Sequence, residues 1–165
     1  MKARRVTKHL LTTNGAVKRA FPRRVMDLIE AAIQASELTH SGQVRFAVEG
    51  SLDGAPLFND QSVRDRAIDV FSQLRVWDTE HNNGLLIYLL LADRAVEIVA
   101  DRGIHQKIPA HQWNAMCQQM EAAFKQSDFE GGALGGLQAV TQQLARHFPR
   151  TEVRKNELPD KAIVL

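Results

Sequence analysis

Residues 77–103, WDTEHNNGLLIYLLLADRAVEIVADRG, decide the fold that we expect for this chain. Residues 85–92 form an unbroken apolar run, which is short enough for a strand and apolar on both faces, as in the central strand of a covered sheet. The polar pair Asp93-Arg94 interrupts this pattern, and residues 96–101 then largely alternate, as a strand with one wetter face does. The stretch therefore predicts a tight antiparallel hairpin.

Upstream segments extend this hairpin into a larger sheet. Residues 21–38 carry apolar side chains at helical spacing, residues 43–49 alternate as a strand, and residues 63–74 again follow a helical pattern. A right-handed crossover between the two strands makes residues 43–49 parallel to residues 85–92. The expected fold class is α/β, a three-layer α/β/α sandwich with a small mixed sheet built from a parallel βαβ unit and an antiparallel hairpin strand.

The remainder of the chain is predicted to be mostly helical. One helix starts after Pro109, and its stripe of Trp113, methionines and Cys117 is interpreted as core packing, with an inert buried thiol. The glycine-rich residues 131–136 open the last helix, and residues 162–165 are expected to pack as a short edge strand.

Length and composition suit a single domain, since the chain has 165 residues with 44% hydrophobic and 24% charged content. We divide it into a basic N-terminal arm at residues 1–20, an α/β domain at residues 21–150 and a C-terminal tail at residues 151–165. The longest apolar run is too short to span a bilayer, and no apolar block of a signal peptide follows the basic start. We therefore expect a cytoplasmic protein, with peripheral contact to the inner membrane left open.

Positive charge is concentrated at the start of the chain. Residues 1–24 hold eight Lys or Arg and no acid, although the net charge of the whole chain is only +2. This pattern favours contact with an anionic membrane surface or a membrane-protein partner, while the alternative is an arm that folds back on the acidic body. Nucleic acid is disfavoured because residues 1–24 contain only one aromatic residue that could stack on a base, Phe21.

Three polar segments are expected to meet where the two parallel strands begin, because parallel strands start at the same edge and the hairpin returns there. These segments are the helix exit near residue 40, residues 78–84 and the turn after residue 100. Their side-chain oxygens are the ligand class that Ca²⁺ or Mg²⁺ prefers. The candidate metal ligands are Glu37, Asp78, Glu80, Asn82, Asn83 and Asp101.

Open α/β sheets usually bind ligands at the opposite edge, where parallel strands end. The rival site at that edge consists of Glu49, Ser51, Asp53, Asp93 and Arg94. We favour the first edge because more oxygen donors from more segments meet there.

The motifs of common catalytic classes are missing from the sequence, including phosphate-binding glycine loops, the nucleophile elbow of α/β-hydrolases and the paired histidines of zinc proteases. His40 and His81 lie near the proposed cluster and titrate in the right range for an acid or base, although loop histidines are commonly just solvated. No substrate follows from these residues alone.

The order of these motifs resembles the TPM domain, a family named for proteins that include a thylakoid acid phosphatase. The resemblance rests on Asn82-Asn83-Gly84 before an apolar strand, on Asp93-Arg94 in the hairpin and on a turn centred at Gly103. Residues 37–42 match the helix exit of the family, and the similarity spans roughly residues 25–148. The segment Asn156-Glu157-Leu158-Pro159-Asp160 is similar to the tail of a short soluble bacterial branch.

The resemblance implies an α/β/α sandwich, binding of a divalent metal with Ca²⁺ as the usual candidate, weak acid phosphatase activity in some members and an accessory role in membrane complexes in others. Residues 77–81 replace a glycine-containing loop here, and their extra acids favour a cation and repel phosphate. We therefore expect a metal-binding accessory or interaction module, since no nucleophile is evident. The alternative is a weak divalent-metal-dependent acid phosphatase for a small phosphate ester, in which Arg102 stabilises the phosphoryl oxygens and His40 or His81 protonates the leaving group.

Overall fold

The sheet of the computed structural model, which describes residues 2–151 and 155–165, has the strand order β3-β2-β1-β4. Strand β1 pairs in parallel with β2 and β4, and β2 pairs antiparallel with β3. The strands are β1 (Gln43–Glu49), β2 (Gly84–Leu90), β3 (Ala95–Ala100) and β4 (Ile163–Val164).

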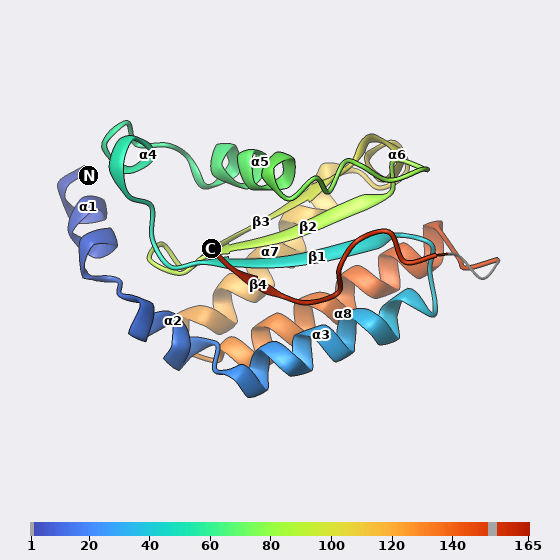
Figure 1. Ribbon diagram of the computed structural model, residues 1–165, viewed down its shortest axis with the longest axis horizontal. Coiled ribbons are helices and arrows are strands. Elements are labelled where there is room, and N and C mark those ends of the chain that lie inside the picture. The colour runs from blue at the N-terminus through green and yellow to red at the C-terminus, as the bar shows by residue number, and fades with distance from the viewer. Residues whose placement is uncertain (1, 152–154) are drawn as a thin grey trace.

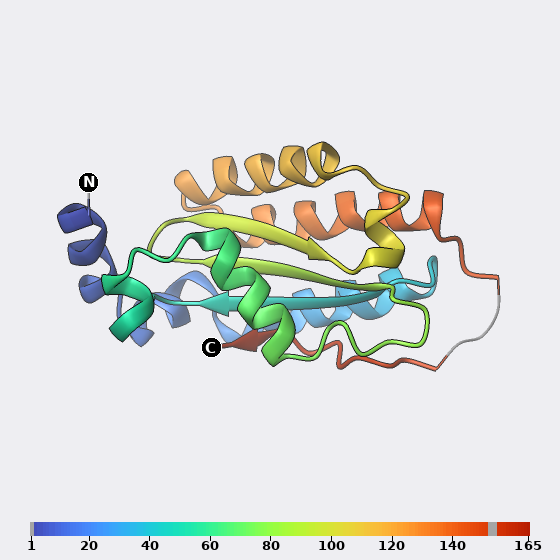
Figure 2. The ribbon, with the colours of Figure 1, turned by 90° about the horizontal axis from the view of Figure 1, so that it is seen from above.

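Helices cover both faces of this sheet. Figures 1 and 2 show α3, α7 and α8 on one face and α5 on the other, which confirms the α/β class and the layered arrangement. The helices are α1 (Lys2–Leu11), α2 (Asn14–Ala20), α3 (Arg23–Glu37), α4 (Gly54–Phe58), α5 (Val63–Gln73), α6 (Arg102–His105), α7 (Ala110–Lys125) and α8 (Phe129–His147).

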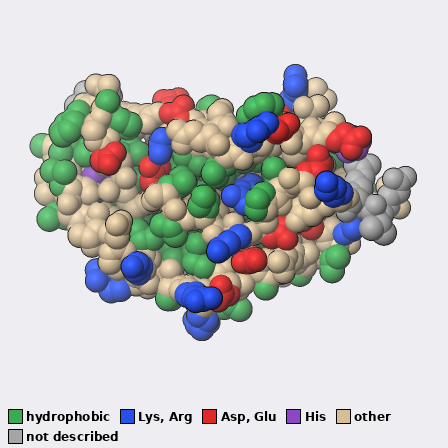
Figure 3. All heavy atoms as spheres, in the orientation of Figure 1, with side chains coloured by type: hydrophobic (Ala, Val, Ile, Leu, Met, Phe, Trp, Pro, Cys, Tyr) green, Lys and Arg blue, Asp and Glu red, His purple; other side chains and the backbone are tan. Residues whose placement is uncertain are grey.

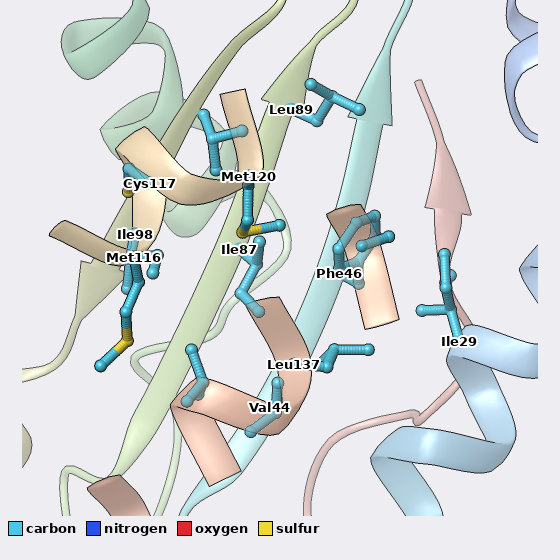
Figure 4. Packing of buried hydrophobic residues seen from close by; sticks show 14 of the residues in the cluster. Ile29, Val44, Phe46, Ile87, Leu89, Ile98, Met116, Cys117, Met120 and Leu137 are labelled. Atoms are coloured by element: carbon cyan, nitrogen blue, oxygen red, sulfur yellow. The ribbon is translucent and has the colours of Figure 1, made fainter. Parts of the chain in front are cut away.

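Strand β2 is apolar along its whole length because both of its faces are covered. Every one of its residues is buried. Ile87 and Leu89 belong to the cluster with α3, α7 and α8 (Figure 4), whereas Leu86 and Tyr88 belong to the cluster with α5. Successive side chains of β2 therefore point to opposite faces of the sheet and pack into two different hydrophobic clusters.

The N-terminal arm forms two helices, α1 and α2, which the charge pattern alone did not predict. Arg5 Nε donates to Asp93 Oδ2 at 2.9 Å, and Arg5 Nη1 donates to Asp60 Oδ1 at 2.9 Å. His9 is buried, its Nδ1 accepts from the backbone N–H of Leu52 at 2.8 Å, and its Nε2 lies 3.2 Å from Asp93 Oδ1. The arm thus folds back on acidic groups of the body, which is one of the alternatives left open by its charge.

At the start of β2, the backbone of Gly84 lies very close to the backbone of Val76, and this closeness allows a stability prediction. A methyl group at Gly84 would lie 1.9 Å from the backbone carbonyl oxygen of Val76, so Gly84→Ala must displace backbone. We expect it to lower the free energy of unfolding by about 1–3 kcal/mol, the usual range for overpacking, and toward the upper end because backbone must move. Urea denaturation followed by circular dichroism measures this change.

The matched control is Gly135→Ala, because Gly135 lies inside α8 and, apart from its chain neighbours and the nearby backbone of its own helix, no described atom lies within 4 Å of the added methyl group. It should be neutral or stabilise the protein by roughly 0.5–1 kcal/mol, since alanine is the better helix former. Equal effects of the two substitutions would contradict the close packing at Gly84.

Candidate functional site at the amino edge of the sheet

The amino edge, where β1 and β2 begin and β3 ends, brings three segments of the chain together. The backbone N–H of Gln43 donates to the carbonyl oxygen of Asn83 at 2.9 Å, and that of Asp101 donates to Gly84 at 2.9 Å. The N–H of Gly103 donates to the carbonyl oxygen of Asn82 at 3.0 Å. The segments that the topology predicts as neighbours therefore lie together.

Two buried oxygen atoms of this edge have no hydrogen-bond partner within the part of the chain that the structure describes. They are Asn83 Oδ1 and Asp101 Oδ2. The amide Nδ2 of Asn83 donates to the carbonyl oxygen of Ser41, while Asp101 Oδ1 caps α6 by accepting from the N–H of Arg102 at 2.7 Å. Buried polar atoms are normally paired, so each of these two oxygens is expected to take a partner such as a water molecule or an ion.

Asn82 stands beside them in a left-handed backbone conformation, with φ of 51°. Asparagine tolerates this conformation better than most residues. Its Oδ1 accepts from Arg102 Nε at 3.4 Å, which ties the loop to the start of α6.

The other predicted metal ligands, Glu37, Asp78 and Glu80, contact different groups from these oxygens. Glu37 Oε1 accepts from the N–H of Val44 at 3.4 Å, Asp78 pairs with Arg75 at 2.6 Å, and the side chain of Glu80 is 79% exposed. Among residues 2–151 and 155–165, no three His, Cys, Asp or Glu side chains are grouped closely enough to hold a metal ion. The six predicted ligands therefore do not form one carboxylate-rich coordination sphere. The joined segments at this edge offer the side-chain oxygens of Asn82, Asn83 and Asp101.

A separate small pocket of about 180 Å³ adjoins this edge, and it is lined by Glu37, His40, Arg150 and Asp160 among others. Burial lowers the pKa of His40 to about 4, and the charge of Arg150 acts in the same direction. Burial raises the pKa of Glu37 to about 7, and neighbouring Asp160 adds to this rise. At neutral pH the imidazole of His40 is therefore neutral, and the carboxyl group of Glu37 binds its proton more tightly than an exposed glutamate does.

The three predicted catalytic residues, His40, His81 and Arg102, lie in three different environments. His40 is buried in this pocket, whereas His81 is exposed on the loop beside Glu80, with its Nε2 3.8 Å from the carboxylate. The exposed Arg102 contacts Asn82. These contacts do not place the three side chains around a common point.

The rival site lies at the carboxyl edge, where β1 and β2 end. Two of its carboxylates, Glu49 and Asp93, are paired with basic side chains of the protein itself. Both oxygens of Glu49 accept from Arg66 at 2.8 Å, and the hydroxyl of Tyr88 donates to Glu49 at 2.5 Å. Asp93 is held by Arg5 and His9. Tyr88 lies opposite Ala47 in the parallel register, so it faces the same side of the sheet as Glu49. The predicted parallel pairing of the two strands was therefore the sequence signal for the contact between Tyr88 and Glu49.

Fold and site together define an α/β/α domain with a polar loop edge above a buried parallel strand pair. The chain belongs to the TPM domain family, whose model matches residues 21–143. It is similar to the solution structure of the BA42 protein from the psychrophilic bacterium Bizionia argentinensis, with a TM-score of 0.74 and 29% identity over 86% of this chain and 92% of that chain. No curated protein matches it.

The family match begins at residue 21, so α1 and α2 lie outside the matched residues. None of the helices described here is long and apolar enough to cross a membrane.

The pocket of Glu37 predicts an unusual pH dependence of stability. Because the folded-state pKa of Glu37 is raised to about 7, the folded protein binds this proton more tightly than the unfolded chain, and its contribution to stability is lost as pH rises from about 4.5 through 7. Glu37→Gln stays neutral, so its free energy of unfolding relative to the native protein should increase between pH 5 and pH 8 by on the order of 1 kcal/mol.

Denaturant unfolding at both pH values measures this difference. Glu80→Gln is the control, since Glu80 is exposed and should leave the pH dependence unchanged. A Glu37→Gln protein with the same pH dependence as the native protein would show that Glu37 is not the titrating group.

Proposed function

We propose that this TPM domain is an accessory binding module that takes a divalent cation, Ca²⁺ or Mg²⁺, at its amino edge. The observation that carries the proposal is a pair of buried oxygens, Asn83 Oδ1 and Asp101 Oδ2, to which none of the described residues donates a hydrogen bond. They lie on segments that backbone hydrogen bonds join. A buried acceptor without a partner costs free energy, and a bound cation would remove that cost.

The composition of this donor set determines what kind of site it would be. Its side-chain donors are all oxygen, which suits a hard cation, but Asp101 supplies the only full negative charge among Asn82, Asn83 and Asp101. A site with one carboxylate binds weakly and keeps room for water or for the oxygens of another molecule. These properties favour a module whose cation site is completed by a partner.

The alternative, a weak divalent-metal-dependent acid phosphatase, requires a proton donor and a group that stabilises the phosphoryl oxygens. His40 has a pKa of about 4, so its imidazole is mostly neutral above that pH and a poor acid. Arg102 contacts Asn82, apart from the pocket of His40. The geometry therefore supports the binding module better.

Thermal melting with increasing CaCl₂ or MgCl₂ tests the cation site. Because a ligand bound only by the folded state adds about 2.7 kcal/mol at 100 times its Kd, the melting temperature of the native protein should rise by several degrees at saturation. Asp101→Asn keeps the helix-capping oxygen and removes the charge, so it should lose most of this rise.

Asp53→Asn is the matched control, since Asp53 is an exposed residue that also precedes a short helix, at the opposite edge. It should respond to the ions like the native protein. No rise in the native protein, or equal rises in the two variants, would overturn the proposed site.

Turnover of p-nitrophenyl phosphate distinguishes the alternative. The module predicts no hydrolysis above background with any divalent ion between pH 5 and pH 8. Ion-dependent hydrolysis that is lost in both His40→Gln and Arg102→Gln would instead support the phosphatase.

A further inference from the structure

A groove of about 840 Å³ lies at the carboxyl edge, on the other side of the molecule from the proposed cation site. It is bounded by α1, α2, the turn between β2 and β3 and the end of α7, which lie close together in Figures 1 and 2. We call this the arm groove, because the N-terminal arm forms one of its walls.

Four cationic side chains from four different elements line the arm groove. They are Lys8 of α1, Arg19 of α2, Arg94 of the hairpin turn and Lys125 at the end of α7. None of these four side chains forms an ion pair with another described residue. The one acid in the lining, Asp93, is already paired with Arg5 and lies 3.2 Å from His9. The groove is therefore strongly positive.

Contacts of Asp93 and Arg94 in the hairpin turn hold parts of the groove together. Arg5 and His9 attach α1 to the hairpin turn, while Arg94 Nη1 donates to the carbonyl oxygen of Lys125 at 3.0 Å and attaches the turn to α7. Three of the walls, α1, the hairpin turn and the end of α7, are thus joined before any ligand binds, which lowers the entropic cost of binding.

Apolar side chains accompany these charges. Leu11 lines the groove and is 75% exposed, and Leu10 beside it is 69% exposed. In Figure 3, basic side chains gather over α2 at the lower left and hydrophobic side chains gather at the left end of the molecule. Adjacent exposed leucines on a basic helix are typical of segments that lie in the membrane interface.

We propose that the arm groove binds the anionic head group of a membrane phospholipid, with its cations around the phosphate and Leu10 and Leu11 in the acyl layer. The inference deepens the proposed function by naming the partner of the module, and it rests on that function only in treating the chain as a binding protein. The groove uses α1 and α2, which lie outside the residues matched by the family model.

The charges alone would also suit nucleic acid, but the aromatic groups do not. Phe129 is the aromatic residue that lines the groove, and its ring packs against Phe21 and Phe124 with ring centroids 5.6 Å apart in each pair. That ring is occupied in the core and does not offer a free face to a base. Exposed leucines beside cations fit a lipid surface better.

Cosedimentation with phosphatidylcholine vesicles, with and without phosphatidylglycerol, tests the proposal in the absence of divalent ions. The native protein should bind only the anionic vesicles. Arg94→Asn with Lys125→Gln should weaken this binding about tenfold or more, because each cation near an anionic surface contributes substantially to binding. Asparagine suits the left-handed backbone of Arg94, with φ of 50°.

The control pair Arg146→Asn with Lys161→Gln removes the same charge from exposed sites outside the groove and should bind about as well as the native protein. Leu10→Ser, at an exposed position, should also weaken binding. Melting temperatures confirm that each variant is folded.

Several results would overturn the proposal. These are absence of vesicle binding, equal losses in the two charge pairs, and binding to a single-stranded oligonucleotide or to inorganic phosphate without binding to vesicles. Asp101→Asn separates the two proposals, because it should lose the response to Ca²⁺ and keep vesicle binding. Vesicle binding without any response to Ca²⁺ would overturn the cation site alone.

Discussion

The parallel pairing of β1 with β2 is the constraint on which the rest of the structure depends. Its register runs from Gln43 opposite Gly84 to Glu49 opposite Leu90, so the two strands begin level and end level. Both are buried along their whole length, and a shift by one residue would turn every side chain to the wrong face. This fixed register gives the sheet two distinct edges, each assembled from distant parts of the sequence.

The two edges differ in chemistry because their charges are used differently. At the carboxyl edge, Glu49 and Asp93 are paired with arginines of α5 and α1, so these carboxylates do not neutralise the four cations of the arm groove, which form no ion pair within the part of the chain that the structure describes. At the amino edge, Asn83 and Asp101 each keep one buried oxygen that receives no hydrogen bond from residues 2–151 and 155–165. In our proposal the cation site therefore belongs to the part of the chain matched by the family model, and the membrane contact involves the arm that precedes it.

Periodicity predicted the strands and the helices α3, α5, α7 and α8, because burial of apolar side chains dictates them. The parallel crossover and the returning hairpin then predicted the meeting of three segments at the amino edge. Periodicity did not predict which polar side chains pair, because the partners come from segments that are distant in the sequence. Burial raises the pKa of Glu37 with a further contribution from Asp160 near the C-terminus, and the charge of Arg150 adds to the lowering of the pKa of His40 by burial. The helices of the arm were missed because its charge concealed an apolar pattern, in which Val17 and Phe21 reach the core.

The central claim is that the free oxygens of the amino edge hold a divalent cation. The most direct measurement is a Ca²⁺ titration followed residue by residue in two-dimensional ¹H–¹⁵N NMR spectra. Our account predicts saturable shifts of backbone amide signals concentrated at residues 82–84 and 101–103. Shifts concentrated at residues 49–53 and 91–94, or spread evenly over exposed acids such as Asp78 and Glu80, would contradict it.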